Sequence, residues 1–146
     1  MASKLASKVS DLLFVYGTLR QGSSHHHILK SLHGAYLGPA TVAGELFDLD
    51  RFPGARLIEP KVPGVGNRRV KGELYRLQNP TSDLDVLDRY EGLQPSTPET
   101  SLFRRELAWV RTQGGKTMQA WIYVLARRPA AARLIPSGNY VKAFWG

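Results

Sequence analysis

The sequence contains no cysteine among its 146 residues. Disulfide bonds, thiolate nucleophiles and cysteine-based metal sites are therefore excluded, and the absence fits a reducing cytoplasm. No segment approaches the ~20 consecutive apolar residues that a membrane-spanning helix requires. The segment Met1–Ser10 lacks the apolar core of a secretory signal, so we expect it to form a solvated arm. These absences predict a cytoplasmic protein without a membrane segment.

Acidic residues are few: 12 Asp and Glu stand against 20 Lys and Arg, which gives a net charge of +8. Such a surface attracts polyanions at low salt. The basic residues are spread along the chain, however, and no nucleic-acid-binding motif accompanies their densest pairs, Arg68-Arg69, Arg104-Arg105 and Arg127-Arg128. We therefore interpret the charge as a solvated surface and rank specific nucleic-acid binding last among the candidate functions. The oligomeric state is not predicted.

The composition, with 42% hydrophobic and 22% charged residues, is that of an ordinary globular domain. A chain of this length suffices for one domain with a substantial core. We expect a single domain over residues 11–146, in which a C-terminal tail from about residue 127 runs over the surface and is anchored by Tyr140, Phe144 and Trp145.

Short β-strands dominate the predicted secondary structure. Apolar runs and alternating patterns predict strands at Leu12–Val15, Thr41–Leu49, Ala55–Glu59, Val70–Leu77, Leu102–Arg111 and Thr117–Ala126. Gly44 and Gly72 lie inside two of these strands, which indicates bends or close backbone approaches typical of a small barrel. The sequence Gln113-Gly114-Gly115 predicts a hairpin between the last two strands.

A first helix is predicted over His25–Leu32, with Ser23 or Ser24 as its N-cap. It begins with the run His25-His26-His27. Adjacent side chains on a helix point about 100° apart, so three successive histidines do not converge on one metal ion. We therefore predict no metal site at this run.

A second helix is predicted over Asp83–Tyr90. Pro80 is excluded from a helix interior, Ser82 is a suitable N-cap, and Gly92 is a natural C-terminal stop. Three aspartates of this segment point away from its apolar face, so we expect them at the solvated surface: Asp83, Asp85 and Asp88.

Glu91 is the candidate acid or base. It follows Leu84 and Leu87 with the spacing of one helix face, so its carboxylate is directed toward the apolar interior or a pocket opening from it. Desolvation there raises the pKa of a carboxyl group toward neutrality, where it serves as a general base or acid. The alternative is an exposed carboxylate at a helix end that pairs with Arg104 or Arg105.

The strand Leu12–Val15 ends in the loop formed by Gly17 and the polar residues that follow it. A buried strand that breaks into such a loop exposes backbone N–H groups, which hold an anion or a developing oxyanion. The alternative is an ordinary turn after a core strand.

Two segments resemble the gamma-glutamylcyclotransferase-like (AIG2-like) family. One is Tyr16-Gly17-Thr18-Leu19-Arg20, and the other is Leu87-Asp88-Arg89-Tyr90-Glu91-Gly92, in which the family carries its catalytic glutamate. The resemblance extends to the strands Val70–Tyr75 and Ala120–Val124 and covers roughly Leu12 to Leu125 in the same order.

The resemblance implies an α+β fold, a small mixed β-barrel with a few flanking helices and a pocket for a γ-glutamyl group. The implied reaction, of the lyase or acyltransferase type, cyclises a γ-glutamyl amine or peptide to 5-oxoproline and releases the amine, with Glu91 as general acid/base. It implies no metal or organic cofactor. The residues it assigns to substrate binding are Tyr16, Gly17, Thr18 and Leu19, and Tyr123 offers a further hydroxyl.

The chain departs from the family pattern at two places. Leu93 and the pair Leu102-Phe103 stand in regions where members often carry tyrosines. The hydroxyl of Tyr123 is a candidate replacement, although Tyr16 and Tyr123 suit the wall of a barrel equally well. These departures leave a second hypothesis open, a non-catalytic module that binds a small anion or a partner on the same fold.

Overall fold

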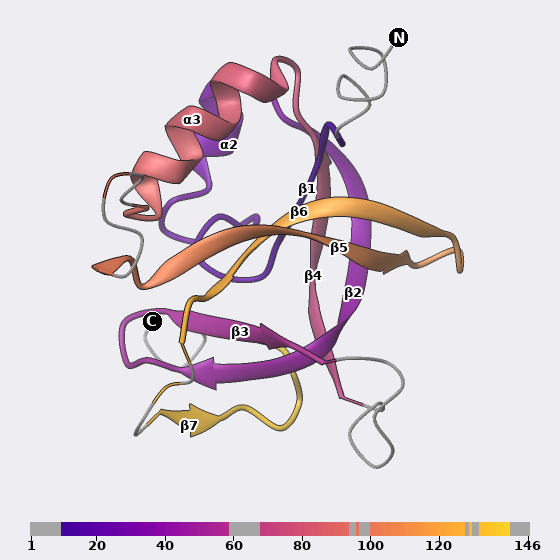
Figure 1. Cartoon of the computed structure of the whole chain (residues 1–146). Helices are drawn as coiled ribbons and strands as arrows, with labels where there is room; N and C mark the ends of the chain where they lie inside the picture. Colours follow the sequence, from indigo (N-terminus) through magenta and orange to yellow (C-terminus); the bar gives the residue numbers. More distant parts are fainter. Residues whose placement is uncertain are drawn as a thin grey trace, which may run out of the picture.

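The computed structural model describes residues 10–58, 68–93, 96, 100–127, 129 and 132–140. Within them, two helices lie together on one side of a closed β-barrel (Figure 1). The strands are β1 (Leu12–Val15), β2 (Ala35–Asp48), β3 (Pro53–Leu57), β4 (Arg69–Arg76), β5 (Phe103–Thr112), β6 (Thr117–Leu125) and β7 (Arg133–Leu134). The helices are α2 (His27–Ser31) and α3 (Pro80–Tyr90). Neither of these described helices is long and apolar enough to cross a membrane.

The barrel closes through β2, which pairs with β4 on one side and with β5 on the other. The strand order is β2-β4-β1-β6-β5, and the pairs are antiparallel except for the parallel pair β1–β6. The second half of β2 leaves the barrel and pairs with β3 and β7. The predicted small mixed β-barrel with a few flanking helices is confirmed.

Strand β1 is buried on both faces, which explains its uninterrupted apolar sequence. Leu12 and Phe14 point into the core inside the barrel, whereas Leu13 and Val15 belong to a second core beneath the helices. Because both faces are covered, β1 has a fixed register, and the bend that follows Val15 has a fixed position.

Strand β2 begins at Ala35, six residues before the predicted start at Thr41. The sequence did not predict this extension because Gly38 and Pro39 are both unfavourable inside a strand. Gly38 has φ +122°, and the pairing with β4 shifts register between Tyr36 and Gly38. An irregularity in the strand therefore accommodates both residues.

The glycines inside the strands mark close approaches of the backbone, as predicted. A Cβ atom on Gly72 would lie 2.2 Å from the carbonyl oxygen of Val15, and one on Gly44 would lie 2.6 Å from that of Arg56. Only a residue without a side chain fits at these two crossings.

Helix α3 starts earlier than predicted. Asn79 is its N-cap and Pro80 its first residue, so Ser82 lies inside the helix and the predicted cap is wrong. Proline is favoured at this first position because its missing N–H would have no helical partner there. Asp83 is 5% exposed, and its carboxylate accepts the backbone N–H of Asn79 at 2.9 Å, which corrects its predicted surface position. Asp85 is exposed, as predicted.

The C-terminal end of α3 is the predicted glycine stop. Gly92 has φ +75°, its N–H donates to the carbonyl of Arg89 at 3.1 Å, and the N–H of Leu93 donates to that of Asp88 at 3.0 Å. These two bonds form a Schellman motif, which fixes the backbone around Glu91. Helix α2, by contrast, starts at His27 without a side-chain cap, so the predicted serine cap is wrong.

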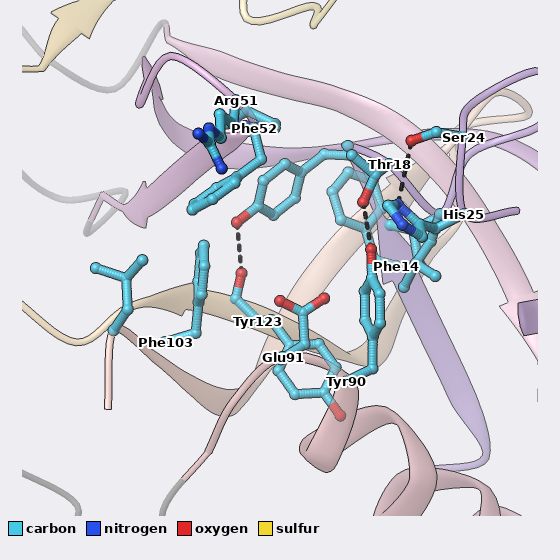
Figure 2. A pocket seen from close by; sticks show the side chains of 16 residues that line it. Phe14, Thr18, Ser24, His25, Arg51, Phe52, Tyr90, Glu91, Phe103 and Tyr123 are labelled. Carbon is cyan, nitrogen blue, oxygen red and sulfur yellow. Dashed lines mark hydrogen bonds between the residues drawn. The ribbon is translucent and has the colours of Figure 1, made fainter. Parts of the chain in front are cut away.

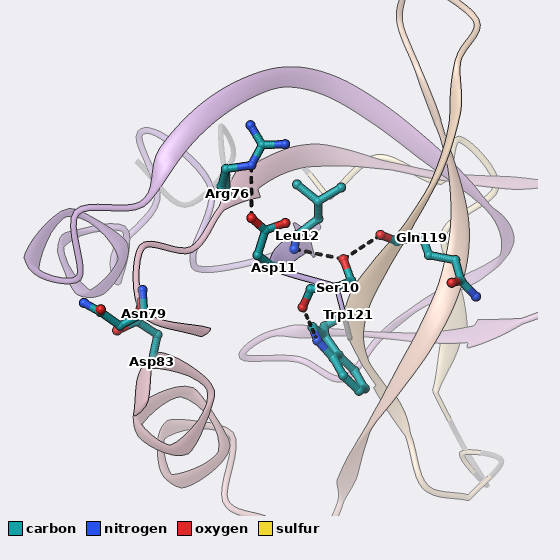
Figure 3. A network of polar contacts seen from close by, with 8 residues as sticks. All are labelled: Ser10, Asp11, Leu12, Arg76, Asn79, Asp83, Gln119 and Trp121. Carbon is teal, nitrogen blue, oxygen red and sulfur yellow. Dashed lines mark hydrogen bonds and ion pairs between the residues drawn. The ribbon is translucent and has the colours of Figure 1, made fainter. Parts of the chain in front are cut away.

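The start of the described chain is tied to the barrel (Figure 3). The hydroxyl of Ser10 donates to the carbonyl of Gln119 at 2.7 Å, and the indole N–H of Trp121 donates to the carbonyl of Ser10 at 2.9 Å. Ser10 is therefore part of the domain, whereas residues 1–9 of the expected arm lie outside the described residues. In the tail, Tyr140 is buried as expected, and Phe144 and Trp145 lie outside the described residues.

Candidate active site

A cavity of about 390 Å³ opens between the bend after β1, the end of α3 and the turn between β2 and β3 (Figure 2). Its volume suits a small-molecule ligand. Every site residue predicted from the sequence lines it: Tyr16, Gly17, Thr18, Leu19, Glu91 and Tyr123. The fold thus brings together two motifs that lie some seventy residues apart in the chain.

The bend after β1 lines this cavity with Gly17, Thr18 and Leu19. The carbonyl of Gly17 accepts the N–H of Arg20 at 3.1 Å, and the carbonyl of Thr18 accepts that of His25 at 3.0 Å. Within the described part of the chain, the N–H groups of Gly17, Thr18 and Leu19 donate no hydrogen bond. The loop therefore uses its carbonyls inside the protein and keeps three N–H donors for a ligand.

Glu73 holds the far end of this loop in place, a role that the sequence did not reveal. The residue is 8% exposed, and its carboxylate accepts hydrogen bonds from the Gln21 N–H at 3.0 Å and from the Tyr75 hydroxyl at 2.9 Å. The Arg20 guanidinium lies 3.6 Å from the same carboxylate and also donates to Asn139 at 2.8 Å. Burial and these bonds make Glu73 a rigid anchor for the loop.

Glu91 caps the C-terminus of α3, where its N–H donates to the carbonyl of Leu87 at 2.9 Å. Leu84 and Leu87 are buried on the same helix face, as predicted, and the Glu91 side chain turns into the cavity (Figure 2). Among the described residues its carboxylate has no hydrogen-bond or ion-pair partner. The alternative pairing with Arg104 or Arg105 is not observed.

The environment of Glu91 raises its pKa from an ordinary value of 4.5 to about 7. Burial is the larger cause, because desolvation penalises the charged form, and the negative charge of Asp88 adds to it. A carboxyl group with a pKa near neutrality exchanges a proton in either direction at physiological pH.

Asp88 is a structural partner and not the solvated residue predicted from the helix pattern. The guanidinium of Arg105 donates to its two carboxylate oxygens at 2.8 and 3.1 Å, and the hydroxyl of Tyr123 donates to it at 2.5 Å. Arg105 also lies over the ring of Trp121, 4.4 Å from its centroid. This network joins α3 to β5 and β6, and the acceptor that holds Arg105 is Asp88 and not Glu91.

Both tyrosine hydroxyls assigned to substrate binding are engaged by the protein. The Tyr16 hydroxyl donates to the carbonyl of Tyr123 at 2.6 Å and accepts the N–H of Ala55 at 3.0 Å. Burial raises the pKa of Tyr16, so the phenol stays neutral. With the Tyr123 hydroxyl bound to Asp88, the two residues offer ring surface to the cavity, and their role as hydrogen donors to a substrate stays a prediction.

Tyr90 contacts the site although the sequence did not indicate it. Its hydroxyl and that of Thr18 form a hydrogen bond of 2.7 Å across the cavity wall (Figure 2). This bond ties the loop after β1 directly to the residue preceding Glu91. Tyr90 stands at a variable position of the segment Leu87–Gly92, and its partner Thr18 comes from a distant element. The sequence therefore carries no indication of this contact.

The three adjacent histidines face different surroundings. The Nδ1 of His26 lies 2.9 Å from the carbonyl oxygen of Leu19, and the ring of His25 packs against that of Tyr90 with centroids 5.3 Å apart. In the described ranges no cluster of His, Asp and Glu side chains is placed to hold a metal ion. Of the three, His25 lines the cavity.

Comparison with known proteins extends the resemblance to most of the chain. A family model described as gamma-glutamyl cyclotransferase, AIG2-like, matches residues 13–142. The gamma-glutamylcyclotransferase family protein ytfP of Citrobacter rodentium is 36% identical over 132 residues, covering 88% of this chain and 94% of that protein. The gamma-L-glutamyl-butirosin B gamma-glutamyl cyclotransferase of Niallia circulans is 36% identical over 117 residues, 79% of this chain and 67% of that protein.

The crystal structure of an AIG2-like protein from Mus musculus shares the fold, with a TM-score of 0.69 and 21% identity over 91% of this chain and 89% of that one. The family match, the relatives and the shared barrel agree with one another. The chain belongs to the AIG2-like gamma-glutamylcyclotransferase family of enzymes.

Proposed function

We propose that the protein cyclises a γ-glutamyl amine or γ-glutamyl peptide to 5-oxoproline, with Glu91 as general acid/base. The observation that carries the proposal is one juxtaposition. A carboxylate with a pKa of about 7 shares a cavity with three residues whose backbone N–H groups are free, and neither the carboxylate nor these N–H groups have a partner among the described residues. The first can move a proton at neutral pH, and the second can bind negative charge.

The reaction is an intramolecular acyl transfer. Glu91 accepts a proton from the substrate's α-ammonium, and the freed amine attacks the γ-carbonyl carbon, so that a new C–N bond closes a five-membered ring. The tetrahedral intermediate then collapses as Glu91 returns its proton to the departing nitrogen and the original amide C–N bond breaks. The ring nitrogen gives up its extra proton to the released amine, so the products are 5-oxoproline and an ammonium ion. Ring closure between groups of one molecule gains from proximity, so proton transfer and charge stabilisation are what the protein must supply.

The N–H groups of Gly17, Thr18 and Leu19 are the donors available for the substrate's α-carboxylate or for the oxyanion of the intermediate. The loop that carries them is fixed at one end by β1 and at the other by Glu73, so the donors are positioned before substrate arrives. The bond between Thr18 and Tyr90 sets the position of the loop relative to Glu91.

The test is to incubate the purified protein with a panel of γ-glutamyl amines and peptides and to measure 5-oxoproline. Product from any of them, formed in proportion to enzyme concentration, is the expected result. Binding of these compounds without product, measured by calorimetry on the same samples, would instead support the non-catalytic module and contradict the proposal.

A further inference from the structure

The cavity has a second end, away from Thr18. Figure 2 shows the Glu91 carboxylate between the two ends, with Thr18 on one side and the rings of Phe52 and Phe103 on the other. A γ-glutamyl compound whose reacting amide bond lies at Glu91 has its γ-glutamyl group on one side of this residue and its departing amine on the other. One of these two parts must therefore extend into the second end.

Apolar side chains form the wall of this end. The rings of Phe52 and Phe103 pack with centroids 5.9 Å apart and planes tilted by 52°. Phe103 is 6% exposed, and Leu102 beside it is 48% exposed at the rim of the cavity. An exposed leucine next to two packed rings is surface that a ligand with an apolar group would cover favourably.

Arg51 supplies the one permanent cation among the described residues that line the cavity. It lies in the turn between β2 and β3, where the N–H of Leu49 donates to the carbonyl of Phe52 at 3.0 Å. Asp50 adopts φ +86° in this turn, and its N–H donates to the Asp48 carboxylate at 2.8 Å.

The turn thus fixes the backbone of Arg51, whereas its guanidinium has no ion-pair partner within the described ranges. Figure 2 shows this side chain next to the ring of Phe52 at the edge of the cavity. The guanidinium is therefore available to an anion bound in this end.

These features fit one kind of leaving group. Of the two anions that the N–H groups can hold, we place the γ-glutamyl α-carboxylate there. With the α-ammonium facing Glu91, the departing amine then occupies the second end. We propose that Arg51, Phe52, Leu102 and Phe103 form a leaving-group subsite that selects γ-glutamyl dipeptides whose second residue has an apolar side chain and a free carboxylate. This inference rests on the proposed function.

An apolar amino acid meets both requirements of the subsite, because the carbon that bears the departing nitrogen carries both a side chain and a carboxylate. A diamine would place a positive charge near Arg51, which is unfavourable. Glycine would leave the apolar wall in contact with water, and a dipeptide amide would lack the anion that the guanidinium accepts.

The first experiment compares kcat/KM for γ-glutamyl-phenylalanine, its C-terminal amide, γ-glutamyl-glycine and a γ-glutamyl diamine. We expect γ-glutamyl-phenylalanine to be preferred over its amide by about two- to fivefold, because an ion pair at a partly exposed rim is of modest strength. The Arg51→Gln variant should bring this ratio close to one, and added salt should lower it in the wild type. Arg56→Gln, on the same hairpin but outside the cavity, should keep the wild-type ratio.

The second experiment measures binding without turnover, so that the two proposals fail separately. The Glu91→Gln variant is titrated calorimetrically with γ-glutamyl-phenylalanine and with its amide, and tighter binding of the acid supports the subsite even if no product ever forms. Equal affinities, or a preference for the acid that survives Arg51→Gln, would overturn the subsite assignment. Absence of 5-oxoproline from every substrate would overturn the proposed function instead.

Discussion

Replacing Glu91 by glutamine tests the electrostatics of the site through folding stability, independently of catalysis. A carboxyl group whose pKa is raised in the folded state loses its proton there less readily than in the unfolded chain. Its contribution therefore destabilises the fold increasingly as pH rises from 4.5 to about 7, and remains constant above that range. Glutamine has no proton to lose and removes this penalty.

The size of the effect follows from the shift in pKa. A change from 4.5 to about 7 corresponds to about 3 kcal/mol, at about 1.4 kcal/mol for each pKa unit. This is an upper bound, because solvent at the mouth of the cavity screens part of it. We expect Glu91→Gln to raise the free energy of unfolding by up to about 3 kcal/mol at about pH 8.5, and by little at about pH 4.

Urea denaturation of the two proteins at both pH values measures this difference directly. Asp85→Asn is the matched control, because Asp85 is an exposed carboxylate on the same helix. It should change stability by less than about 1 kcal/mol at either pH. A gain from Glu91→Gln that is equal at both pH values, or a loss at alkaline pH, would refute the reasoning.

Three further predictions address the reaction and the geometry of the site. The kcat/KM for 5-oxoproline formation should rise with pH through a midpoint near 7 as Glu91 becomes a base; a pH–rate profile that is flat between about 5.5 and 8.5 contradicts this. Gly17→Ala places a Cβ atom 2.9 Å from Cγ of Pro53, so it should raise KM and lower stability by about 1–3 kcal/mol, measured by kinetics and urea denaturation. Gly72→Ala places a Cβ atom 2.2 Å from the rigid carbonyl oxygen of Val15, so it should destabilise by more than about 4 kcal/mol and yield little folded protein by circular dichroism; near-normal stability would show that the two strands can separate.

The parts of the site that are encoded locally could be predicted from the sequence. The bend after β1 follows from an apolar run that meets Gly17, and the inward direction of Glu91 follows from its spacing to Leu84 and Leu87. Both inferences need only the geometry of one strand or one helix. The family resemblance predicted that the bend and Glu91 belong to one site, and the structure places both in one cavity.

The partners of the charged groups could not be predicted in the same way. Asp88 looks like a surface residue on a helical wheel, yet it holds Arg105 from β5 and Tyr123 from β6. Glu73 holds Gln21, which is 52 residues away in the chain. Which distant side chain meets a given carboxylate depends on how the barrel closes, and periodicity within one element does not contain that information.

The most direct test of the account compares 5-oxoproline formation by the wild type, Glu91→Gln and Asp85→Asn on one γ-glutamyl dipeptide at about pH 8. General acid–base catalysis contributes on the order of 10²–10⁴-fold, so Glu91→Gln should lose that much of kcat while it folds and binds the dipeptide. Asp85→Asn should retain wild-type kcat. A folded Glu91→Gln variant that releases 5-oxoproline at a rate close to that of the wild type would contradict the assignment of Glu91 as the group that moves the proton.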